Sequence, residues 1–325
     1  KQTESGGLTM DATGAENHTT ILVIEPSPVE RDMLWVGTDD GRVHYTRNGG
    51  QNWTEVTRNI RGLPEGSWIA QIRASANNPG EALLVANDYR RHNYTPYAYR
   101  TRDYGKSWER IVSEEDVASY TLSIIEDPEN PQLMFLGTDD GLYISMNAGS
   151  SWTKWNHGYP TVSTKDLAIH PREQDLVIGT FGRAAWVMDD IRPLRAITRN
   201  PEVLKQDIAL FPSPTAYDAA YQQPTGSRFG ADALFNGENR RSGAMVTYFL
   251  KEGRKEIEAR RAQDVSDSDK ESGQTAADPK NEERDSAKTS ESSKDSVTFR
   301  FYDGDRLIRT LTYKTPDSAG LHRIY

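Results

Sequence analysis

The chain has 325 residues, a formal net charge of −9, 35% hydrophobic and 27% charged residues, and no cysteine. An acidic chain without a concentrated basic face is not expected to bind nucleic acid or an anionic membrane surface. The lack of cysteine excludes disulfides, thiolate catalysis and zinc–thiolate sites. No apolar run reaches the ~18 residues that a membrane-spanning helix needs, so the protein is predicted not to be transmembrane.

A repeated unit of short strands begins near residue 21. The segments Gly37–Gly41 and Gly137–Gly141 both read Gly-Thr-Asp-Asp-Gly, and Gly179–Arg183 is a third relative. Each of these segments directly follows a short apolar run. A second apolar run lies further upstream in each unit and is followed by a proline. An intermediate copy comprises Ile69–Ala74 and Ala82–Ala86, with a longer insertion, Asn87–Pro96, in place of the turn. Such internal repetition indicates a repeat fold.

A second motif, Ser/Thr-x-Asp/Asn-x-Gly-x-x-Trp, follows three of these turns. Asp or Asn side chains bond backbone N–H groups of their own turn, Gly tolerates positive φ, and Trp buries a large ring against the hairpin. This pattern is the Asp box, and we predict a structural role for its residues: Thr46, Asn48, Gly50 and Trp53; Thr101, Asp103, Gly105 and Trp108; Ser145, Asn147, Gly149 and Trp152.

Four strands recur every 42–55 residues, which is typical of a propeller blade. In the first unit we expect strands at Ile21–Ile24, Met33–Val36, Val43–Thr46 and Asn52–Val56. A parallel β-helix would need coils about half as long. The sequence therefore predicts an all-β fold in which residues 1–194 form about four blades, the C-terminal part of a larger Asp-box β-propeller.

The pattern changes after residue 194. Residues 195–229 are predicted to form a linker, and residues 230–325 a truncated immunoglobulin-like sandwich with strands at Ala244–Leu250 and Val297–Tyr302. Residues 251–296 contain no aromatic side chain and few large aliphatic ones, so we expect a disordered acidic and polar insertion there.

Several segments together resemble a known family, the large secreted bacterial BNR (Asp-box) repeat proteins, often labelled sortilin-like or glycosyl hydrolase. The resemblance is carried by Ala15–Ile21, Trp35–Gly41, Tyr99–Trp108, Val177–Leu194, Gly237–Asn239 and Ala319–Arg323. It implies a β-propeller with a C-terminal immunoglobulin-like domain in a bacterial protein that is secreted, periplasmic or on the cell surface.

The resemblance also implies further blades N-terminal to Lys1, which would be the first partner of this segment. Lys1 to Asp11 contain no apolar segment and no initiating Met, and Leu321–Tyr325 fall within a predicted strand. We therefore expect a piece of a longer protein, with the missing blades in the same protein or in a separate chain.

Glycoside hydrolysis would need two suitably spaced carboxylates. The candidates are paired acids after strands: Asp39, Asp40, Asp139, Asp140, Asp189 and Asp190. Asp-Asp-Gly is first a turn signal, and its repetition at equivalent positions favours a structural role. Asn48 and Asn147 replace the acid in two Asp boxes, so those side chains cannot be general acids. We predict no catalytic residue, no cofactor and no metal site.

Two places are predicted to contact a ligand. His18 lies in a polar cluster at a blade entrance, and the basic, aromatic insertion could shape a binding face through Arg90, Arg91, His92, Tyr94 and Tyr97. A satisfied loop histidine and a packing role for the insertion are the alternatives. The sequence favours a non-catalytic module that binds peptides, cell-surface proteins or glycans, with a sialidase- or xyloglucanase-like glycoside hydrolase as the alternative.

Overall fold

The computed structural model describes residues 19–217, 241–260, 263 and 296–325. The chain divides into two compact units, Lys1–Arg199 and Asn200–Tyr325. His18, one of the predicted contact residues, lies outside the described residues.

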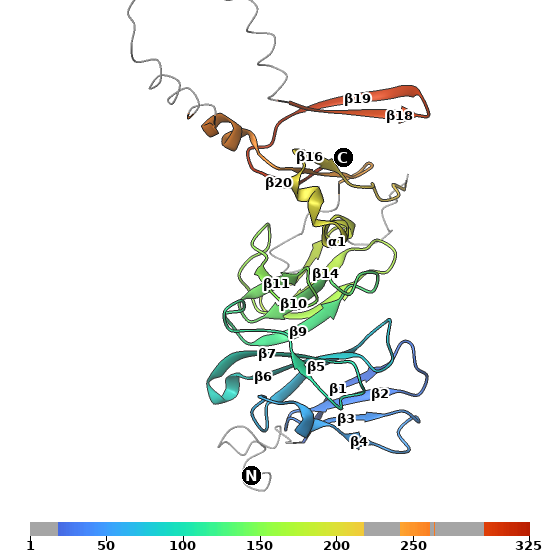
Figure 1. Ribbon diagram of the computed structural model, residues 1–325, viewed down its shortest axis with the longest axis vertical. Coiled ribbons are helices and arrows are strands. Elements are labelled where there is room, and N and C mark those ends of the chain that lie inside the picture. The colour runs from blue at the N-terminus through green and yellow to red at the C-terminus, as the bar shows by residue number, and fades with distance from the viewer. Residues whose placement is uncertain (1–18, 218–240, 261–262, 264–295) are drawn as a thin grey trace, which may run out of the picture. The chain divides into compact units, whose positions relative to one another are not determined.

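The first unit consists of four antiparallel sheets that follow one another along the chain (Figure 1). In each, consecutive strands pair in sequence order, so every sheet is a meander. Blade 1 contains β1 (Ile21–Pro26), β2 (Leu34–Thr38), β3 (Val43–Thr46) and β4 (Thr54–Glu55). Blade 2 contains β5 (Trp68–Ala74), β6 (Ala82–Asp88), β7 (Asn93–Thr101) and β8 (Glu109–Arg110).

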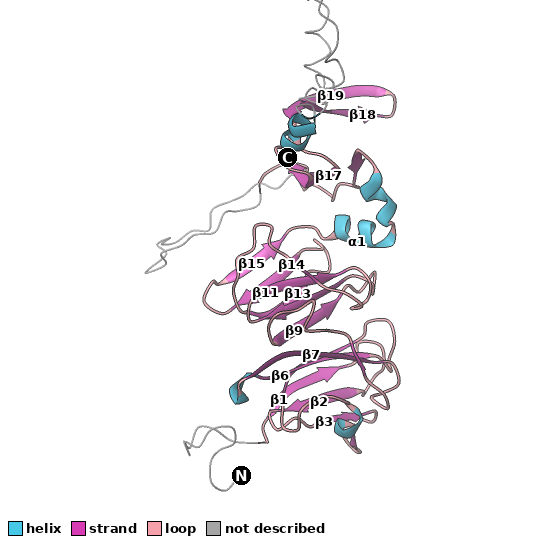
Figure 2. Cartoon of the chain, turned by 60° about the vertical axis from the view of Figure 1, so that its left-hand side comes forward, coloured by secondary structure: helices cyan, strands magenta, loops and turns pink. Residues whose placement is uncertain are grey.

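Blade 3 repeats the arrangement and blade 4 has three described strands. Blade 3 contains β9 (Thr121–Glu126), β10 (Met134–Thr138), β11 (Gly141–Ser145) and β12 (Thr153–Lys154). Blade 4 contains β13 (Thr164–Ile169), β14 (Leu176–Thr180) and β15 (Ala185–Met188). The first strands of successive blades lie beside one another, and the sheets stack face to face (Figure 2). This is the arrangement of consecutive β-propeller blades, which confirms the predicted fold class.

Apolar side chains fill the spaces between neighbouring blades. Met33, Trp35 and Val43 of blade 1 pack with Ile72 and Tyr99 of blade 2 in one core. A second core joins blade 2 to blade 3 and contains Leu83, Val85, Ile124, Met134 and Trp152. Because each core belongs to two blades, a blade cannot bury its apolar faces alone.

The insertion of blade 2 differs from its prediction as a loop. β6 continues to Asp88 and β7 begins at Asn93, so most of Asn87–Pro96 extends the hairpin. Only a short 3-10 helix, η2 (Tyr89–Arg91), and His92, with φ of 60°, form the turn. Asn93 Nδ2 donates to Asp88 Oδ2 at 3.2 Å across the hairpin, which ties the extended strands together.

Helix α1 (Arg192–Arg199) ends the first unit, although a linker is predicted from residue 195. Arg195 is buried and donates to both carboxylate oxygens of Asp127, at 2.5 and 2.7 Å. This bidentate pair holds the helix against blade 3. The second unit starts with another 3-10 helix, η3 (Pro201–Lys205).

The second unit contains a three-stranded antiparallel sheet and a separate hairpin. The sheet has the order β16 (Ile208–Leu210), β17 (Val246–Leu250), β20 (Gly320–Ile324), and the hairpin pairs β18 (Ser296–Asp303) with β19 (Arg306–Lys314). Phe299 packs edge-on against Tyr248, with ring centroids 5.0 Å apart, which brings hairpin and sheet into one core. The immunoglobulin-like sandwich stays a prediction.

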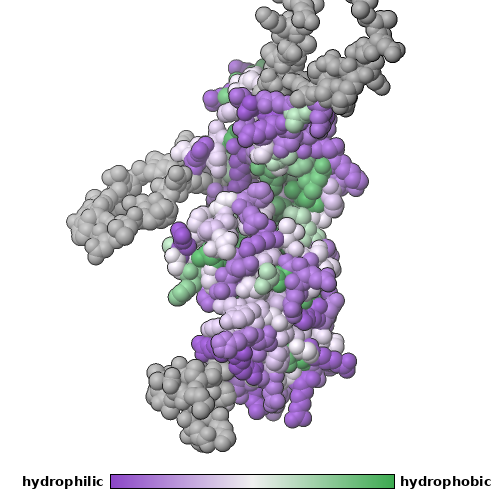
Figure 3. Space-filling model, turned by 90° about the vertical axis from the view of Figure 1, so that its left-hand side faces the viewer, coloured by the Kyte–Doolittle hydropathy of each residue, from purple (hydrophilic) through white to green (hydrophobic). Residues whose placement is uncertain are grey.

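The predicted insertion 251–296 lies mainly outside the described residues. Residues 254–260 are helical, with Arg254 Nη1 3.0 Å from Glu258 Oε1 one turn later. Hydrophilic side chains cover most of the molecular face drawn in Figure 3, where apolar side chains gather in smaller groups.

Candidate functional site: an aromatic–arginine cluster and a carboxylate network

The three Asp boxes form the same hydrogen-bonded turn. In blade 2, Thr101 Oγ1 donates to Asp103 Oδ1 at 2.9 Å and accepts from Gly105 N at 2.8 Å, while Asp103 Oδ1 also accepts from Ser107 N at 2.9 Å. The other two copies repeat these bonds within 0.2 Å: Thr46, Asn48, Gly50 and Asn52; Ser145, Asn147, Gly149 and Ser151. Asn and Asp make the same bonds, so the motif fixes backbone geometry.

The tryptophans of the three boxes have different surroundings. Trp108 packs edge-on against Trp35 of blade 1, with centroids 6.0 Å apart. Trp152 is 5% exposed, and its indole Nε1 donates to Ile111 O of blade 2 at 2.7 Å. Trp53 of blade 1 is 45% exposed. The tryptophan ring thus packs on the preceding blade in blades 2 and 3. Blade 1 has no preceding blade in the described chain.

The paired acids after the second strands are engaged inside their own blades. Asp39 Oδ1 accepts from Thr20 N at 2.8 Å. Asp140 accepts from Lys154 Nζ at 2.8 Å and from Thr138 Oγ1 at 2.7 Å. Burial raises the pKa of Asp140, but these two bonds outweigh it and lower the pKa below its usual value.

Two further acidic candidates, Asp40 and Asp190, have similar local engagements. Asp40 Oδ1 accepts from Thr38 Oγ1 at 2.5 Å, and its other oxygen lies 3.2 Å from Arg42 Nε. Asp190 is buried and lies 2.5 Å from Arg192 Nε. Such local engagements are those of turn residues.

Aromatic rings and one guanidinium gather at the edge of blades 2 and 3 where the first strands begin. We call Trp68, Tyr89, Arg90, Tyr94 and Tyr120 the aromatic–arginine cluster. Tyr89 stacks on Tyr120 with centroids 4.8 Å apart and planes at 19°, and Tyr94 lies 6.1 Å from Tyr120. The Arg90 guanidinium lies 3.4 Å from the centre of the Trp68 ring, which is a cation–π contact.

Blades 2 and 3 both contribute to this cluster, because the edges at which their first strands begin lie side by side. Tyr120 immediately precedes β9, and Asp139, which follows β10, donates its N–H to Tyr120 O at 3.2 Å. Burial and the hydrogen bond to Asp139 raise the pKa of Tyr120. The phenol therefore stays neutral, and its ring supports Tyr89 from the neighbouring blade.

Of the predicted contact residues in the insertion, four lie on the surface and one is buried. Tyr94 is 55% exposed, and Arg90 and His92 are also exposed. Arg91 is exposed, but its guanidinium is occupied by Asp88 Oδ1 at 2.5 Å and by Glu65 O at 2.8 Å.

Tyr97 does not reach the surface. It is 5% exposed because β7 turns its ring into the core of blades 1 and 2, where Asn93 Nδ2 donates to its hydroxyl at 3.0 Å. The prediction of Tyr97 as a contact residue is therefore corrected to a packing role. Sequence reasoning missed Trp68, Tyr89 and Tyr120. Tyr120 stands 100 residues after Thr20, at the same place in the repeat, and that equivalence would have placed it at this edge.

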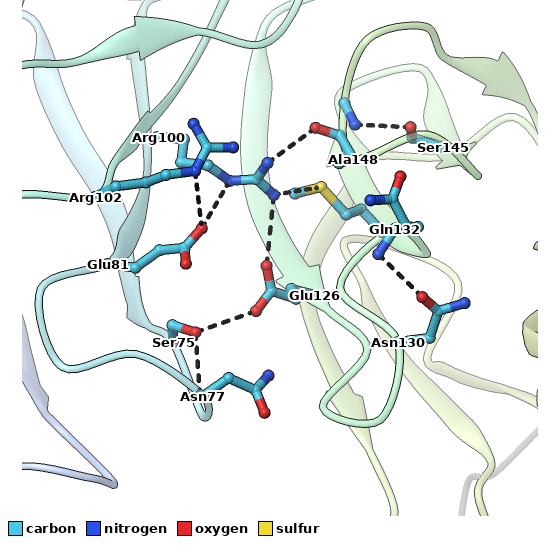
Figure 4. A network of polar contacts seen from close by, with 12 residues as sticks. Ser75, Asn77, Glu81, Arg100, Arg102, Glu126, Asn130, Gln132, Ser145 and Ala148 are labelled. Carbon is cyan, nitrogen blue, oxygen red and sulfur yellow. Dashed lines mark hydrogen bonds and ion pairs between the residues drawn. The ribbon is translucent and has the colours of Figure 1, made fainter. Parts of the chain in front are cut away.

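A buried polar network joins blades 2 and 3 near the other end of the first strands (Figure 4). Arg100, which is 3% exposed, lies at its centre. Its Nη2 donates to Glu126 Oε2 at 3.4 Å, and its Nε lies 3.2 Å from Glu81 Oε1. Its Nη1 donates to Ala148 O of the third Asp box at 3.1 Å, and Ser75 Oγ donates to Glu126 Oε1 at 3.3 Å.

A cavity of about 220 Å³ adjoins this network, and Glu25, Arg73, Glu81 and Glu126 are among its lining residues. Burial and the negative charge of Glu81 raise the pKa of Glu126 to about 7, despite the opposing charge of Arg100. Burial also raises the pKa of Glu25. Carboxyl groups from three blades thus meet in one cavity, and one of them titrates near neutral pH.

The described part of the chain lacks two other features. In that part of the chain no helix is both long and apolar enough to cross a membrane. Within the same ranges no group of three or more His, Asp or Glu side chains is arranged to hold a metal ion.

These turns and sheets define an Asp-box β-propeller segment. Residues 96–194 match the family model Sortilin-Vps10, described as sortilin, neurotensin receptor 3, which confirms the predicted resemblance to sortilin-like Asp-box propellers for this part of the chain.

One curated relative and two solved structures illustrate the likeness. The oligoxyloglucan-reducing end-specific xyloglucanase of Emericella nidulans is 24% identical over 226 residues, covering 63% of this chain and 26% of the relative. The GH74 enzyme of Niastella koreensis has a TM-score of 0.43 at 17% identity, over 53% of this chain and 28% of that one. The GH74 xyloglucanase of Xanthomonas campestris has a TM-score of 0.41 at 18% identity, over 53% and 29%. The chain spans about a quarter of the length of the curated relative.

Proposed function

We propose that this chain is a non-catalytic binding segment of a larger β-propeller, and that the aromatic–arginine cluster is its ligand face. The observation that carries the proposal is the concentration of exposed Tyr94 and Arg90 beside the stacked Tyr89 and Tyr120 rings. Rigid aromatic rings and arginine are the side chains that contribute most to binding energy. Two acids beside the cluster, Asp88 and Asp139, are occupied by Arg91 and Tyr120.

The test is retention of glycans and peptides on arrays by the protein and by two single variants. Tyr94→Ala should abolish most retention, because it removes the most exposed ring of the cluster. Tyr302→Ala is the matched control, since Tyr302 is also 55% exposed but belongs to the second unit. Equal retention by both variants would exclude the cluster as the ligand face.

A second part of the proposal concerns assembly with further blades. Trp53 and Ile24 of blade 1 are 45% and 60% exposed, and Phe181 and Val187 of blade 4 are 74% and 55% exposed. In blade 3, Ile124 and Ile144, at the places equivalent to Ile24 and Val187, are buried. We therefore propose that additional blades, in the same protein or another chain, cover these faces.

Residues 1–325 alone should consequently self-associate in analytical ultracentrifugation. A monomer with one cooperative thermal transition would contradict the assembly proposal.

The cellular location is a separate part of the proposal. By the family resemblance, we also propose that this is a bacterial protein that is secreted, periplasmic or on the cell surface. Fractionation of the source cells tests that location.

The alternative function is glycoside hydrolysis, and the cavity that adjoins Glu126 favours it more than the turn acids do. A general acid needs a raised pKa, and Glu126, with a pKa of about 7, has one. Glu25, from blade 1, would be its partner carboxylate. Release of new reducing ends by the wild type, lost in both Glu126→Gln and Glu25→Gln, would establish this alternative.

A further inference from the structure

Arg90 is a charged group without a carboxylate partner in the described ranges. There, no acidic oxygen lies within 4.0 Å of its guanidinium, whereas the adjacent Arg91 lies 2.5 Å from Asp88 Oδ1. Arg90 Nε donates to Tyr89 Oη at 3.2 Å, and its plane lies over Trp68. These two contacts fix the guanidinium and leave its Nη groups for an external acceptor.

The rings beside Arg90 provide flat apolar faces. Tyr89 and Tyr120 support one another by stacking, and Tyr94 is exposed at their side. An aromatic face is electron-rich and attracts polarised C–H groups, such as those on the face of a pyranose ring. The cluster thus combines a ring-binding surface with one oriented cation, and a complementary ligand carries both a ring and an anionic group.

An extended peptide is a poorer fit to the same surface. Peptides that add to a sheet need a run of free backbone groups, but those of β7 are used locally. Tyr97 N donates to Thr121 Oγ1 at 3.3 Å, Pro96 O accepts from Arg110 at 2.6 Å, and Ala98 O accepts from Ile111 N at 2.9 Å. A nucleic acid is disfavoured by the net charge of −9.

We infer that the aromatic–arginine cluster binds acidic glycans, with a uronate carboxylate on the Arg90 guanidinium and an adjoining pyranose ring on Tyr94. This inference rests on the proposed binding function and narrows its ligand class. Guanidinium and carboxylate form two parallel hydrogen bonds, so the carboxylate would also orient the sugar chain along the rings.

Calorimetry with two matched probes tests the inference: tetragalacturonic acid and its fully methyl-esterified form. The ester keeps the rings and removes the charges. A charge-assisted hydrogen bond is about twice as strong as a neutral one, so the acid should bind at least about tenfold more tightly than the ester. Arg90→Gln should remove that preference and leave the affinity for the ester unchanged. Arg90→Lys should retain part of it, since lysine keeps the charge without the planar fork.

Arg31→Gln is the control, because Arg31 is an exposed arginine of blade 1 and should leave the preference intact. Equal binding of acid and ester, or a preference that survives Arg90→Gln, would overturn the inference while leaving a glycan-binding function in place. If the arrays show that no glycan binds and that acidic peptides bind through Arg90, the ligand class is wrong. If nothing on the arrays binds, the proposed function itself fails.

Discussion

The first blade and the two middle blades carry the same Asp box in different surroundings. The turn bonds of Thr46, Asn48 and Gly50 match those of blades 2 and 3 within 0.2 Å. Trp53 is nevertheless 45% exposed, whereas Trp152 is 5% exposed against blade 2. The hydrogen-bonded turn is thus a local property of the motif, and the burial of its tryptophan is a property of the neighbouring blade.

A glycine that recurs in the second strand of blades 1, 3 and 4 shows the effect of the following blade in the same way. A methyl group on Gly137 would meet Thr164 O of blade 4 at 2.6 Å, and one on Gly37 would lie 2.8 Å from Val23 Cγ1 and still closer to Ile69 of blade 2. A methyl group on Gly179 would find its nearest atom at 3.6 Å, within its own blade. Close approach of the next blade therefore requires glycine only where that blade is present.

The largest expected effect comes from truncating the two tryptophans. Trp152→Ala should lower the free energy of unfolding by about 3–5 kcal/mol, because it opens a cavity in the core and leaves Ile111 O without its indole donor. Trp53→Ala should lower it by less than about 1 kcal/mol in residues 1–325, since nearly half of that ring is exposed. Urea unfolding at low protein concentration measures both.

The same pair of variants also tests the proposed neighbour of blade 1. In a protein that includes the proposed additional blades, the effect of Trp53→Ala should rise toward that of Trp152→Ala, because a preceding blade would bury the ring. Equal and small effects in the long and short forms would show that no blade packs on Trp53.

The next effect concerns the blade 2–3 interface and depends on pH. Unfolded glutamate titrates near 4.5 and Glu126 at about 7, so between these pH values the folded chain holds a proton that the unfolded chain has released. Stability therefore falls as pH rises from about 4.5 to 7, by roughly 3 kcal/mol in all at 1.36 kcal/mol per unit.

Glu126→Gln should consequently be more stable than the wild type at pH 8 and should flatten the decline between pH 5 and 7. Glu25, whose pKa is also raised, leaves a residual slope. Glu109→Gln, at an exposed position of blade 2, is the control and should keep the wild-type profile. A Glu126→Gln profile parallel to that of the wild type would contradict the buried, proton-linked role.

A smaller effect on stability is expected from replacing the recurring glycine by alanine, and it should differ between blade 3 and blade 4. Gly137→Ala should destabilise by about 1–3 kcal/mol through overpacking against Thr164 and Ser123, while Gly179→Ala should change stability by less than about 0.5 kcal/mol. Thermal unfolding of the two variants gives the comparison. A destabilising Gly179→Ala would indicate a neighbour on blade 4.

The smallest effect is expected inside the Asp box. Asp103→Asn should change stability by less than about 0.5 kcal/mol. Asn147 shows why: its Nδ2 donates to Ser151 Oγ at 2.8 Å, where Asp103 accepts from Ser107 Oγ at 2.6 Å, and the backbone bonds are the same. A loss above 1 kcal/mol, measured by urea unfolding, would assign a role to the charge of Asp103.

Local patterns predicted much of the fold, because strand alternation and turn chemistry depend on near neighbours. The strand Val43–Thr46 has the predicted bounds, and β1 extends two residues beyond its predicted end at Ile24. The extended hairpin of blade 2 was not predicted, because its stability depends on Asp88 binding both Arg91 and Asn93 after the chain reverses.

The candidate site was only partly predictable for a related reason. Arg90 and Tyr94 were identified from the composition of one insertion. Tyr120 supports them from another blade, and Glu126 acquires its pKa from burial beside Glu81 of blade 2. Such contacts join residues distant in sequence, and a single sequence without its three-dimensional arrangement does not pair them.

The most direct test of a binding segment without catalysis is a time course of reducing ends. The full-length protein is incubated with a glycan that it retains on the array, and the wild type is compared with Glu126→Gln. We predict that retention persists for hours, that no new reducing end forms, and that Tyr94→Ala abolishes retention. Formation of reducing ends by the wild type and its loss in Glu126→Gln would contradict the account and identify a glycoside hydrolase.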